Sequence, residues 1–179
     1  MTVVIERKIV YVALAVAAIA AAAWGMWHLA THGRTVIGQE RLVAIDPQNA
    51  GINIRVWQPW LEDSVLVFDV GEAGDRDFNR IDVTRCLLQC AQDLQQSDAA
   101  RVYLANCGNC VYYIAGNDFR NLGNHYKKGD DWNNAWVLTS IPAVTHTLND
   151  SLAFAPTTGW LSTVDDATNW NTMMSNLLD

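Results

Sequence analysis

The sequence lacks the short motifs that mark the common classes of enzyme. It holds no phosphate-binding loop, no dinucleotide-binding glycine fingerprint, no nucleophile elbow, no His-Glu-x-x-His zinc motif and no haem-attachment motif. Internal repeats, low-complexity tracts and a second domain boundary are also missing. These absences make enzymatic activity the less favoured interpretation, and they favour a role in binding or assembly.

Basic residues are scarce. The chain has 12 Lys and Arg residues against 19 Asp and Glu residues, which gives a formal net charge of -7. An acidic domain has no electrostatic footprint for nucleic acid, and anionic lipid headgroups repel it. We therefore expect no nucleic-acid partner. The hydrophobic share of 50% is too high for a disordered chain.

One segment has no charged residues at all. Residues 9–29 contain no Asp, Glu, Lys or Arg. About 20 apolar residues in a helix cross the roughly 30 Å hydrocarbon core of a bilayer. The sequence therefore predicts a single transmembrane anchor at 9–29, after a short tail at 1–8, with the lipid bilayer as its partner. Trp24 and Trp27 would form an aromatic belt at the second interface.

A cleaved signal peptide is the competing interpretation of this segment. Arg7 and Lys8 suit the basic start of a signal, and the small residues at 21–23 suit a cleavage site. The apolar run continues to Leu29, however, which favours an uncleaved anchor. A short tail before the span and a long domain after it favour a domain on the extracytoplasmic, or periplasmic, side. Small residues at helical spacing predict a face for packing against a membrane-protein partner; they are Ala13, Ala17, Ala20 and Ala21.

The remaining chain has the size of one globular domain. Residues 30–48 predict a juxtamembrane connector, in which 42–45 could form a short strand, and the domain follows at 49–179. Apolar patterns predict strands at 52–57, 65–70, 101–106, 111–115 and 135–141, and helices at 81–96, 117–123 and 162–179. This order predicts an α+β fold with a single antiparallel sheet and helices packed on one face, preceded by one N-terminal transmembrane helix.

The helix predicted at 81–96 is amphipathic. Leu87 and Cys90 belong to its apolar stripe, whereas polar residues such as Gln89 are expected to face away from the core. Asp77 or Asn79 is expected to cap the helix, because these side chains accept the unpaired amide hydrogens of the first turn.

Four cysteines form two close pairs, Cys86 with Cys90 and Cys107 with Cys110. The favoured interpretation is one or two structural disulfides from the helix to the following hairpin, because an extracytoplasmic domain meets an oxidising environment. Four cysteines allow three pairings, among which the sequence does not choose. Reduced thiols packed as small hydrophobes are the second interpretation. A zinc site with all four as ligands and a redox-active Cys107–Cys110 pair are less favoured.

Other polar clusters give weaker signals. Asp75, Asp77 and Asn79 copy the start of a calcium loop, but Arg80 and Cys86 stand where the loop needs glycine and glutamate. We therefore expect no cofactor, with zinc or calcium only as minor alternatives.

A further polar cluster surrounds His125. It lies near Asp118, Asp130 and Asp131 in the sequence, which is the minimum for general-base chemistry. No activated nucleophile accompanies it, so we expect solvated surface rather than a catalytic site. Asn149 begins a match to a glycosylation acceptor, which matters only in a host that glycosylates.

Two tryptophan pairs lie next to predicted turns, Trp57 with Trp60 and Trp132 with Trp136. Such residues could form a platform for a sugar or a protein partner. The commoner role of tryptophan is to lock strand ends into the core.

These observations lead to one favoured interpretation of function. The sequence predicts a single-pass membrane-anchored protein with an extracytoplasmic acidic α+β domain, which acts as a non-catalytic accessory, assembly or binding module. The alternative is a membrane-tethered thiol-disulfide or zinc-binding protein that uses its four cysteines.

Overall fold

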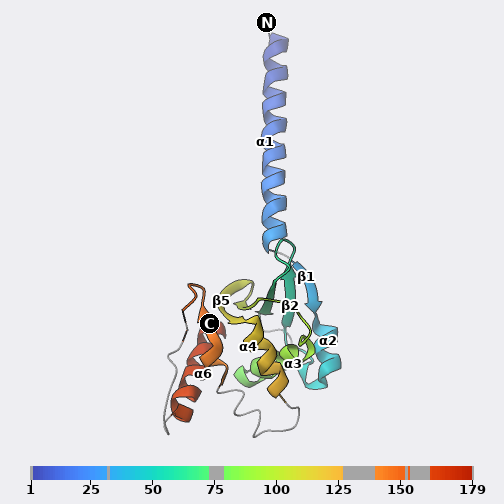
Figure 1. Cartoon of the computed structure of the whole chain (residues 1–179). Helices are drawn as coiled ribbons and strands as arrows, with labels where there is room; N and C mark the ends of the chain where they lie inside the picture. Colours follow the sequence, from blue (N-terminus) through green and yellow to red (C-terminus); the bar gives the residue numbers. More distant parts are fainter. Residues whose placement is uncertain are drawn as a thin grey trace.

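A computed structural model describes residues 2–31, 33–72, 79–126, 140–151, 153 and 162–178, with side chains described outside 2–10, 27–31 and 162–167. A long N-terminal helix, α1, projects from a domain that holds the rest of the chain (Figure 1). The elements in chain order are α1 (Thr2–Thr31), β1 (Gly33–Ile37), α2 (Gln39–Ile45), η1 (Pro47–Asn49), β2 (Ile54–Pro59), β3 (Val65–Val70), α3 (Arg80–Asp93), β4 (Arg101–Asn106), β5 (Asn109–Ala115), α4 (Gly116–His125), η2 (Pro142–Val144), β6 (Thr145–Thr147) and α6 (Ser162–Leu178).

The six strands form one mixed sheet. Their spatial order follows the sequence, from β1 to β6. Neighbouring strands are antiparallel except β3 and β4, which are parallel. The α+β class is confirmed, but the prediction of a single antiparallel sheet is wrong. The reason is the connection through α3, because a helical crossover returns the chain to the edge from which it started and makes the two strands parallel.

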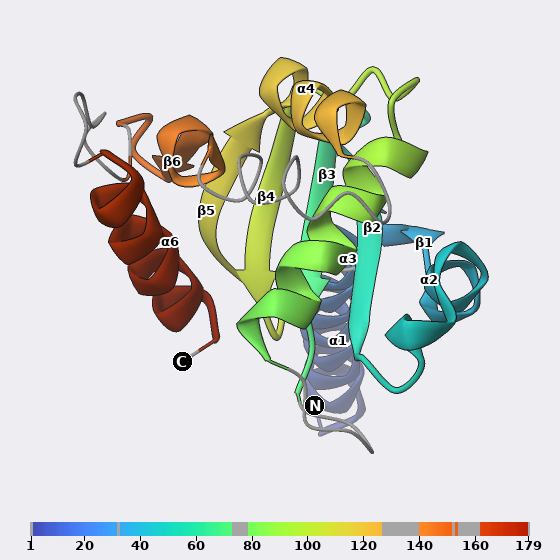
Figure 2. The ribbon, with the colours of Figure 1, turned by 90° about the horizontal axis from the view of Figure 1, so that it is seen from below.

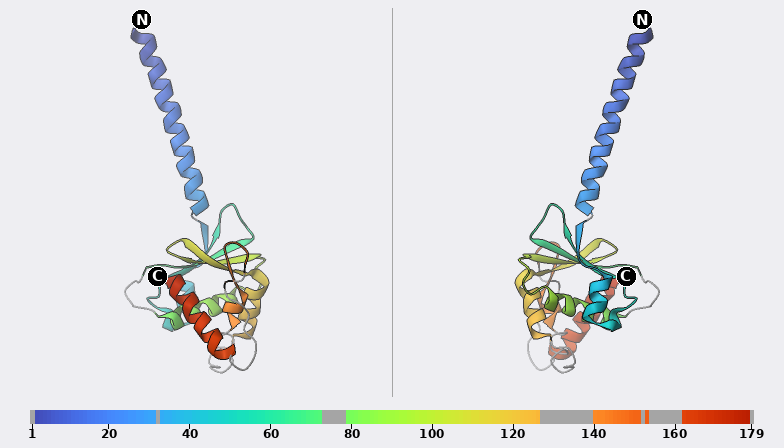
Figure 3. Two further views of the ribbon diagram at one scale, coloured as in Figure 1. Left: turned by 90° about the vertical axis from the view of Figure 1, so that its left-hand side faces the viewer. Right: turned by 90° about the vertical axis from the view of Figure 1, so that its right-hand side faces the viewer.

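The domain helices lie on one side of this sheet. Seen from below, α3 and α4 lie in front of the strands and α1 lies behind them (Figure 2). The side views agree, with α1 leaving from the opposite side to the helices (Figure 3). The main core fills the space between the sheet and the helices, and it includes Phe68, Leu87, Leu104, Phe119 and Met173. We call this side of the sheet the covered face.

The segment expected to be a connector contributes to the sheet and its cover. Residues 33–37 form the edge strand β1, and residues 39–45 form α2 rather than a strand. Leu42 donates its backbone N–H to Gly38 O over 3.0 Å, and its side chain is fully buried in the core. The prediction of a strand at 42–45 is therefore wrong, because the single buried side chain of this segment suits a short helix that presents one face to the core.

Helix α3 begins as predicted but buries a residue expected to face solvent. Asn79 caps it, since Asn79 Oδ1 accepts from the amides of Ile81 and Asp82, and Asp82 Oδ2 accepts from the Asn79 amide over 3.2 Å. Gln89 is buried, contrary to the prediction. It accepts from Asn49 Nδ2 over 2.7 Å, because η1 covers this side of the helix.

Most of the other predicted elements are confirmed. The strands at 65–70 and 101–106 keep their predicted bounds, and α4 and α6 match the predicted helices closely. Most of the strand predicted at 135–141 lies outside the described residues. The short strand β6 was not predicted, since three residues are too few to show a period.

The transmembrane helix predicted at 9–29 falls within α1. Among the residues that the structure describes, none of the helices combines the length and the apolar character needed to cross a membrane. The membrane anchor stays a prediction.

Candidate functional site

The second face of the sheet points toward the side from which α1 leaves (Figure 2). We call it the open face. The alternation of side chains along β2–β6 places on it Arg55, Trp57, Val65, Val67, Asp69, Arg101, Tyr103, Ala105, Cys110, Tyr113 and His146. Four of these form a small apolar cluster of their own, namely Trp57, Val65, Val67 and Ala105, with Tyr103 packed against it.

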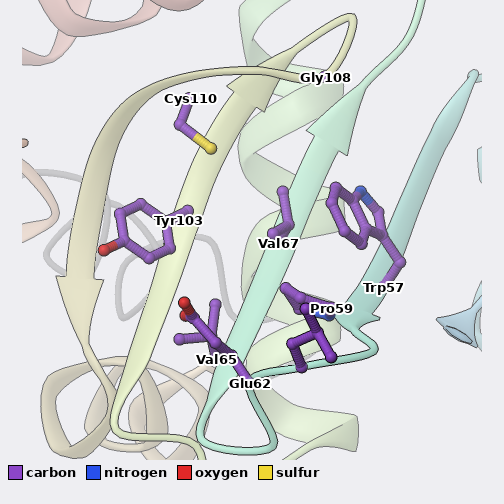
Figure 4. A pocket seen from close by; sticks show the side chains of 9 residues that line it. Trp57, Pro59, Glu62, Val65, Val67, Tyr103, Gly108 and Cys110 are labelled. Carbon is purple, nitrogen blue, oxygen red and sulfur yellow. The ribbon is translucent and has the colours of Figure 1, made fainter. Parts of the chain in front are cut away.

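A shallow pocket of about 390 Å³ lies on the open face. Figure 4 shows Val65 and Val67 as its floor, between the rings of Trp57 and Tyr103. Glu62 supplies a carboxylate at one end. A depression of this kind can hold an apolar or aromatic group, and its single carboxylate favours a ligand that carries a positive charge.

The pocket ends at the turn between β4 and β5, which a buried carboxylate holds in place. Asp69 is almost fully buried, and its Oδ2 accepts from Arg55 Nη2 over 2.9 Å. Its Oδ1 accepts from the Gly108 amide over 2.8 Å. Cys107 and Gly108 both have positive φ, 49° and 81°, as a two-residue type I′ hairpin requires. Cys107 and Gly108 are therefore the two central residues of this turn.

An aromatic group occupies the other end of the open face. The rings of Tyr113 and His146 stack with centroids 4.9 Å apart, and Arg101 lies 5.1 Å from the Tyr113 centroid. The Tyr113 hydroxyl donates to Asp150 Oδ1 over 2.9 Å. Burial and this hydrogen bond raise the pKa of Tyr113, so the phenol stays protonated and acts as a structural donor.

The four cysteines do not come together. Cys86 and Cys90 are buried in the core on the covered face, whereas Cys107 and Cys110 are exposed at the β4–β5 hairpin, and Cys110 lines the pocket on the open face. All four are free thiols. The sheet thus separates the two pairs, and the bridge from helix to hairpin is not present. Disulfides within either pair stay a prediction.

The thiols are also poorly suited to chemistry. Burial raises the pKa of Cys86 to about 12, and it raises the pKa of Cys90 well above the usual value. Burial and the nearby Asp69 carboxylate raise the pKa of Cys110. Thiolate is the form that attacks substrates and binds metals. The buried Cys86 and Cys90 are therefore held in the unreactive form, and the raised pKa of the exposed Cys110 lowers its share of thiolate.

The tryptophans of the first pair have different environments. Trp57 is 7% exposed, and its Nε1 has no hydrogen-bond partner among the described residues. A Cβ on Gly33 would lie 2.5 Å from the Trp57 ring, so glycine permits this close approach. Trp60, by contrast, is 55% exposed in the β2–β3 loop. Trp132 and Trp136 lie outside the described residues, so the second pair stays a prediction.

The remaining predicted clusters are only partly described. Asn79 caps α3, as shown above, whereas Asp75 and Asp77 of the calcium-like motif lie outside the described residues. His125 is exposed at the end of α4, and Asp130 and Asp131 also lie outside. Within the described part of the chain, no group of three or more His, Cys, Asp or Glu side chains is placed to hold a metal ion.

Sequence reasoning missed the open-face pocket, although one signal pointed to it. Every residue of β3 is buried, from Val65 to Val70. A strand with apolar residues at successive positions is one that buries both faces. The run at 65–70 therefore indicated a second buried face of the sheet. No sequence pattern marked Tyr103 on that face, or the exposed Glu62 at the edge of the pocket.

Comparisons with protein-family models, with curated proteins and with solved structures give no match.

Proposed function

We propose that this chain is a single-pass membrane-anchored protein, in which α1 is the anchor and the acidic α+β domain acts on the extracytoplasmic side as a non-catalytic accessory or binding module. The observation that carries the proposal is the surface of α1. Its large apolar side chains point outward around the helix, as Tyr11 and Ile19 illustrate, each 69% exposed.

The apolar surface of such a helix must be shielded from water. A helix that is hydrophobic on all sides is buried in protein or in lipid, because apolar area in water costs roughly 25 cal/mol per Å². In the described part of the chain, α1 meets the domain at its C-terminal end, where it contacts β2, and the rest of the helix projects away (Figure 1). Lipid is the cover that suits a charge-free run of 21 residues at 9–29.

The features of the domain suit a binding role better than a catalytic one. Its candidate site is a shallow apolar pocket lined by one carboxylate, and burial raises the pKa of Cys110, the thiol that lines it. The alternative of a zinc site with four cysteine ligands is less favoured, because the two cysteine pairs lie on opposite faces of the sheet. The alternative of a redox-active Cys107–Cys110 pair is less favoured, because the pKa of Cys110 is raised.

Membrane fractionation of the full chain tests the proposal. We expect the wild-type chain to stay in the membrane pellet through an alkaline carbonate wash, and protease added from the extracytoplasmic side to digest the domain. Replacing Val16→Lys and Ile19→Lys places two charges in the middle of the span, where each costs about 2.5–3.5 kcal/mol. This variant is expected to appear in the soluble fraction.

Ile81→Lys is the matched control, because Ile81 is 61% exposed on α3 and lies in the helix layer away from α1. It is expected to fractionate as the wild type does. Release of the wild-type chain by carbonate would overturn the anchor. Co-purification of a stoichiometric membrane protein in mild detergent would support the accessory role, and a chain that purifies alone would weaken it.

A further inference from the structure

The loop between β2 and β3 presents two large apolar side chains to the outside. Trp60 is 55% exposed and Leu61 is 74% exposed. Few other large apolar side chains are exposed among the described residues of the domain. Two adjacent ones at the tip of a hairpin therefore call for an explanation. Tryptophan concentrates at membrane–water interfaces, where its ring meets the hydrocarbon and its N–H meets the headgroups.

The strand register fixes where this tip lies. Gly33, two residues after the last residue of α1, pairs with Pro59 across the antiparallel β1–β2 ladder. Because β2 runs opposite to β1, the residues that follow Pro59 continue back toward the end of α1. Trp60 and Leu61 therefore lie level with the C-terminal end of α1, and Figures 1 and 3 show this loop rising beside the base of the helix.

Hydrogen bonds hold the loop in this position. Gln58 Nε2 donates to the Asp63 carbonyl, and Gln58 Oε1 accepts from Arg34 Nη2 over 2.9 Å. The loop is closed by the Val65 amide, which donates to the Glu62 carbonyl over 3.2 Å. The side chain of Gln58 thus ties the tip to β1, the strand that directly follows α1, and the tip keeps its place relative to the helix.

We infer that Trp60 and Leu61 enter the interfacial layer of the same bilayer that α1 spans, as a second membrane contact of the domain. The inference rests on the proposed function, because the predicted span ends at Leu29, close to the level of this loop. Glu62 and Asp63 flank the tip and would meet repulsion from anionic lipids, so the contact suits zwitterionic headgroups. It orients the open face toward the membrane rather than leaving the domain to swing freely on one helix.

Quenching of tryptophan fluorescence by brominated lipid tests this inference on the full chain in vesicles of brominated phosphatidylcholine. Trp24→Phe and Trp27→Phe remove the two tryptophans of the span and keep it apolar. Six of the eight tryptophans then remain, and we expect brominated lipid to quench the part of the emission that comes from Trp60. Bromine near the headgroup should quench more than bromine at the chain end.

In the same background, Trp60→Gln is expected to abolish the lipid-dependent quenching. Trp170→Phe is the matched control, because Trp170 packs in the helix layer of the domain, and it should leave the quenching unchanged. If the chain binds vesicles but Trp60 is not quenched, the inference is overturned and the anchor is left intact. A loop that is covered by a protein partner instead of lipid would give this result. A chain that does not float with the vesicles overturns the proposed function, and this inference with it.

Discussion

The two faces of the sheet are built from the same strands but differ in what covers them. On the covered face, Phe68 and Leu104 are enclosed by α3, α4 and α6 in one continuous core. On the open face, Val67 and Ala105 are equally buried, yet among the described residues they are shielded by neighbouring side chains of the sheet, such as Trp57 and Tyr103, and not by a helix. A buried side chain therefore does not by itself show whether its face of the sheet is available for binding. What matters is whether helices cover that face.

Thiol labelling should show the largest difference between the two faces. In the reduced full chain, a thiol reagent reaches Cys107 and Cys110 directly, whereas Cys86 and Cys90 react only when the core opens. An opening free energy of about 5 kcal/mol or more slows the reaction by more than about 10³-fold. Mass spectrometry should therefore find two fast and two slow sites. Four fast sites would show that the core is not closed, and four slow sites would show that the hairpin is covered.

The next largest effect is expected at alkaline pH, which should destabilise the core on the covered face. Because burial raises the pKa of Cys86 to about 12, the folded chain holds this proton more tightly than the unfolded chain does. The stabilisation is complete below the usual pKa near 9 and is lost as the pH rises toward 12. Each such thiol steepens the fall by up to about 1.4 kcal/mol per pH unit.

Denaturant unfolding at several pH values measures this fall. Cys86→Ala is expected to make it shallower. Val83→Ala on the same helix is the control, because it lowers the free energy of unfolding at every pH without changing the slope. An unchanged slope for Cys86→Ala would contradict the account.

Matched valine substitutions compare the packing of the faces. Val102 lies on the covered face and Val67 on the open face, and both are buried. Val67→Ala should cost about 1.5 kcal/mol, the transfer of two methyl groups at ~0.8 kcal/mol each. Val102→Ala should cost about 1 kcal/mol more, because it leaves a closed cavity. Equal losses in urea unfolding would show that the open face is as well covered as the other.

The last comparison sets the buried ion pair on the open face against an exposed side-chain contact. Arg55→Ala leaves the Asp69 carboxylate buried, with the Gly108 amide as its remaining partner among the described residues, which should cost about 1–3 kcal/mol. Thermal unfolding measures the loss. Arg34→Ala removes an exposed arginine that bonds Gln58, and it should cost less than about 0.5 kcal/mol. A neutral Arg55→Ala would show that solvent already replaces the pair.

Local patterns predicted the parts of the fold that local chemistry decides. Asn79 caps α3 because its side chain accepts from the amides of the first turn. The apolar, β-branched run at 65–70 forms β3, and its own residue types are enough to predict a strand. Long-range packing decided the rest. Gln89 is buried because η1, forty residues earlier, supplies Asn49 as its partner. The parallel pairing of β3 with β4 follows from the path through α3, which no single window of sequence contains.

The candidate site was predictable only in part, for the same reason. Trp57 and Trp60 stood out by residue type, but the sequence did not show that one is buried and the other exposed. The paired cysteines stood out by spacing, yet the strand alternation that puts Cys110 on the open face becomes visible only once the β4–β5 register is known. Tyr103 joins the pocket through a parallel neighbour, Val67, and has no marker of its own.

Photolabelling from within the bilayer tests the central claim most directly. The full chain in lipid vesicles is treated with a carbene precursor that partitions into the hydrocarbon core, and the labelled residues are mapped by mass spectrometry. The account predicts label along 9–29 and none at Ile81, although Ile81 is 61% exposed. Absence of label from 9–29, or equal label at Ile81, would contradict a membrane-anchored domain with its helix layer turned away from the bilayer.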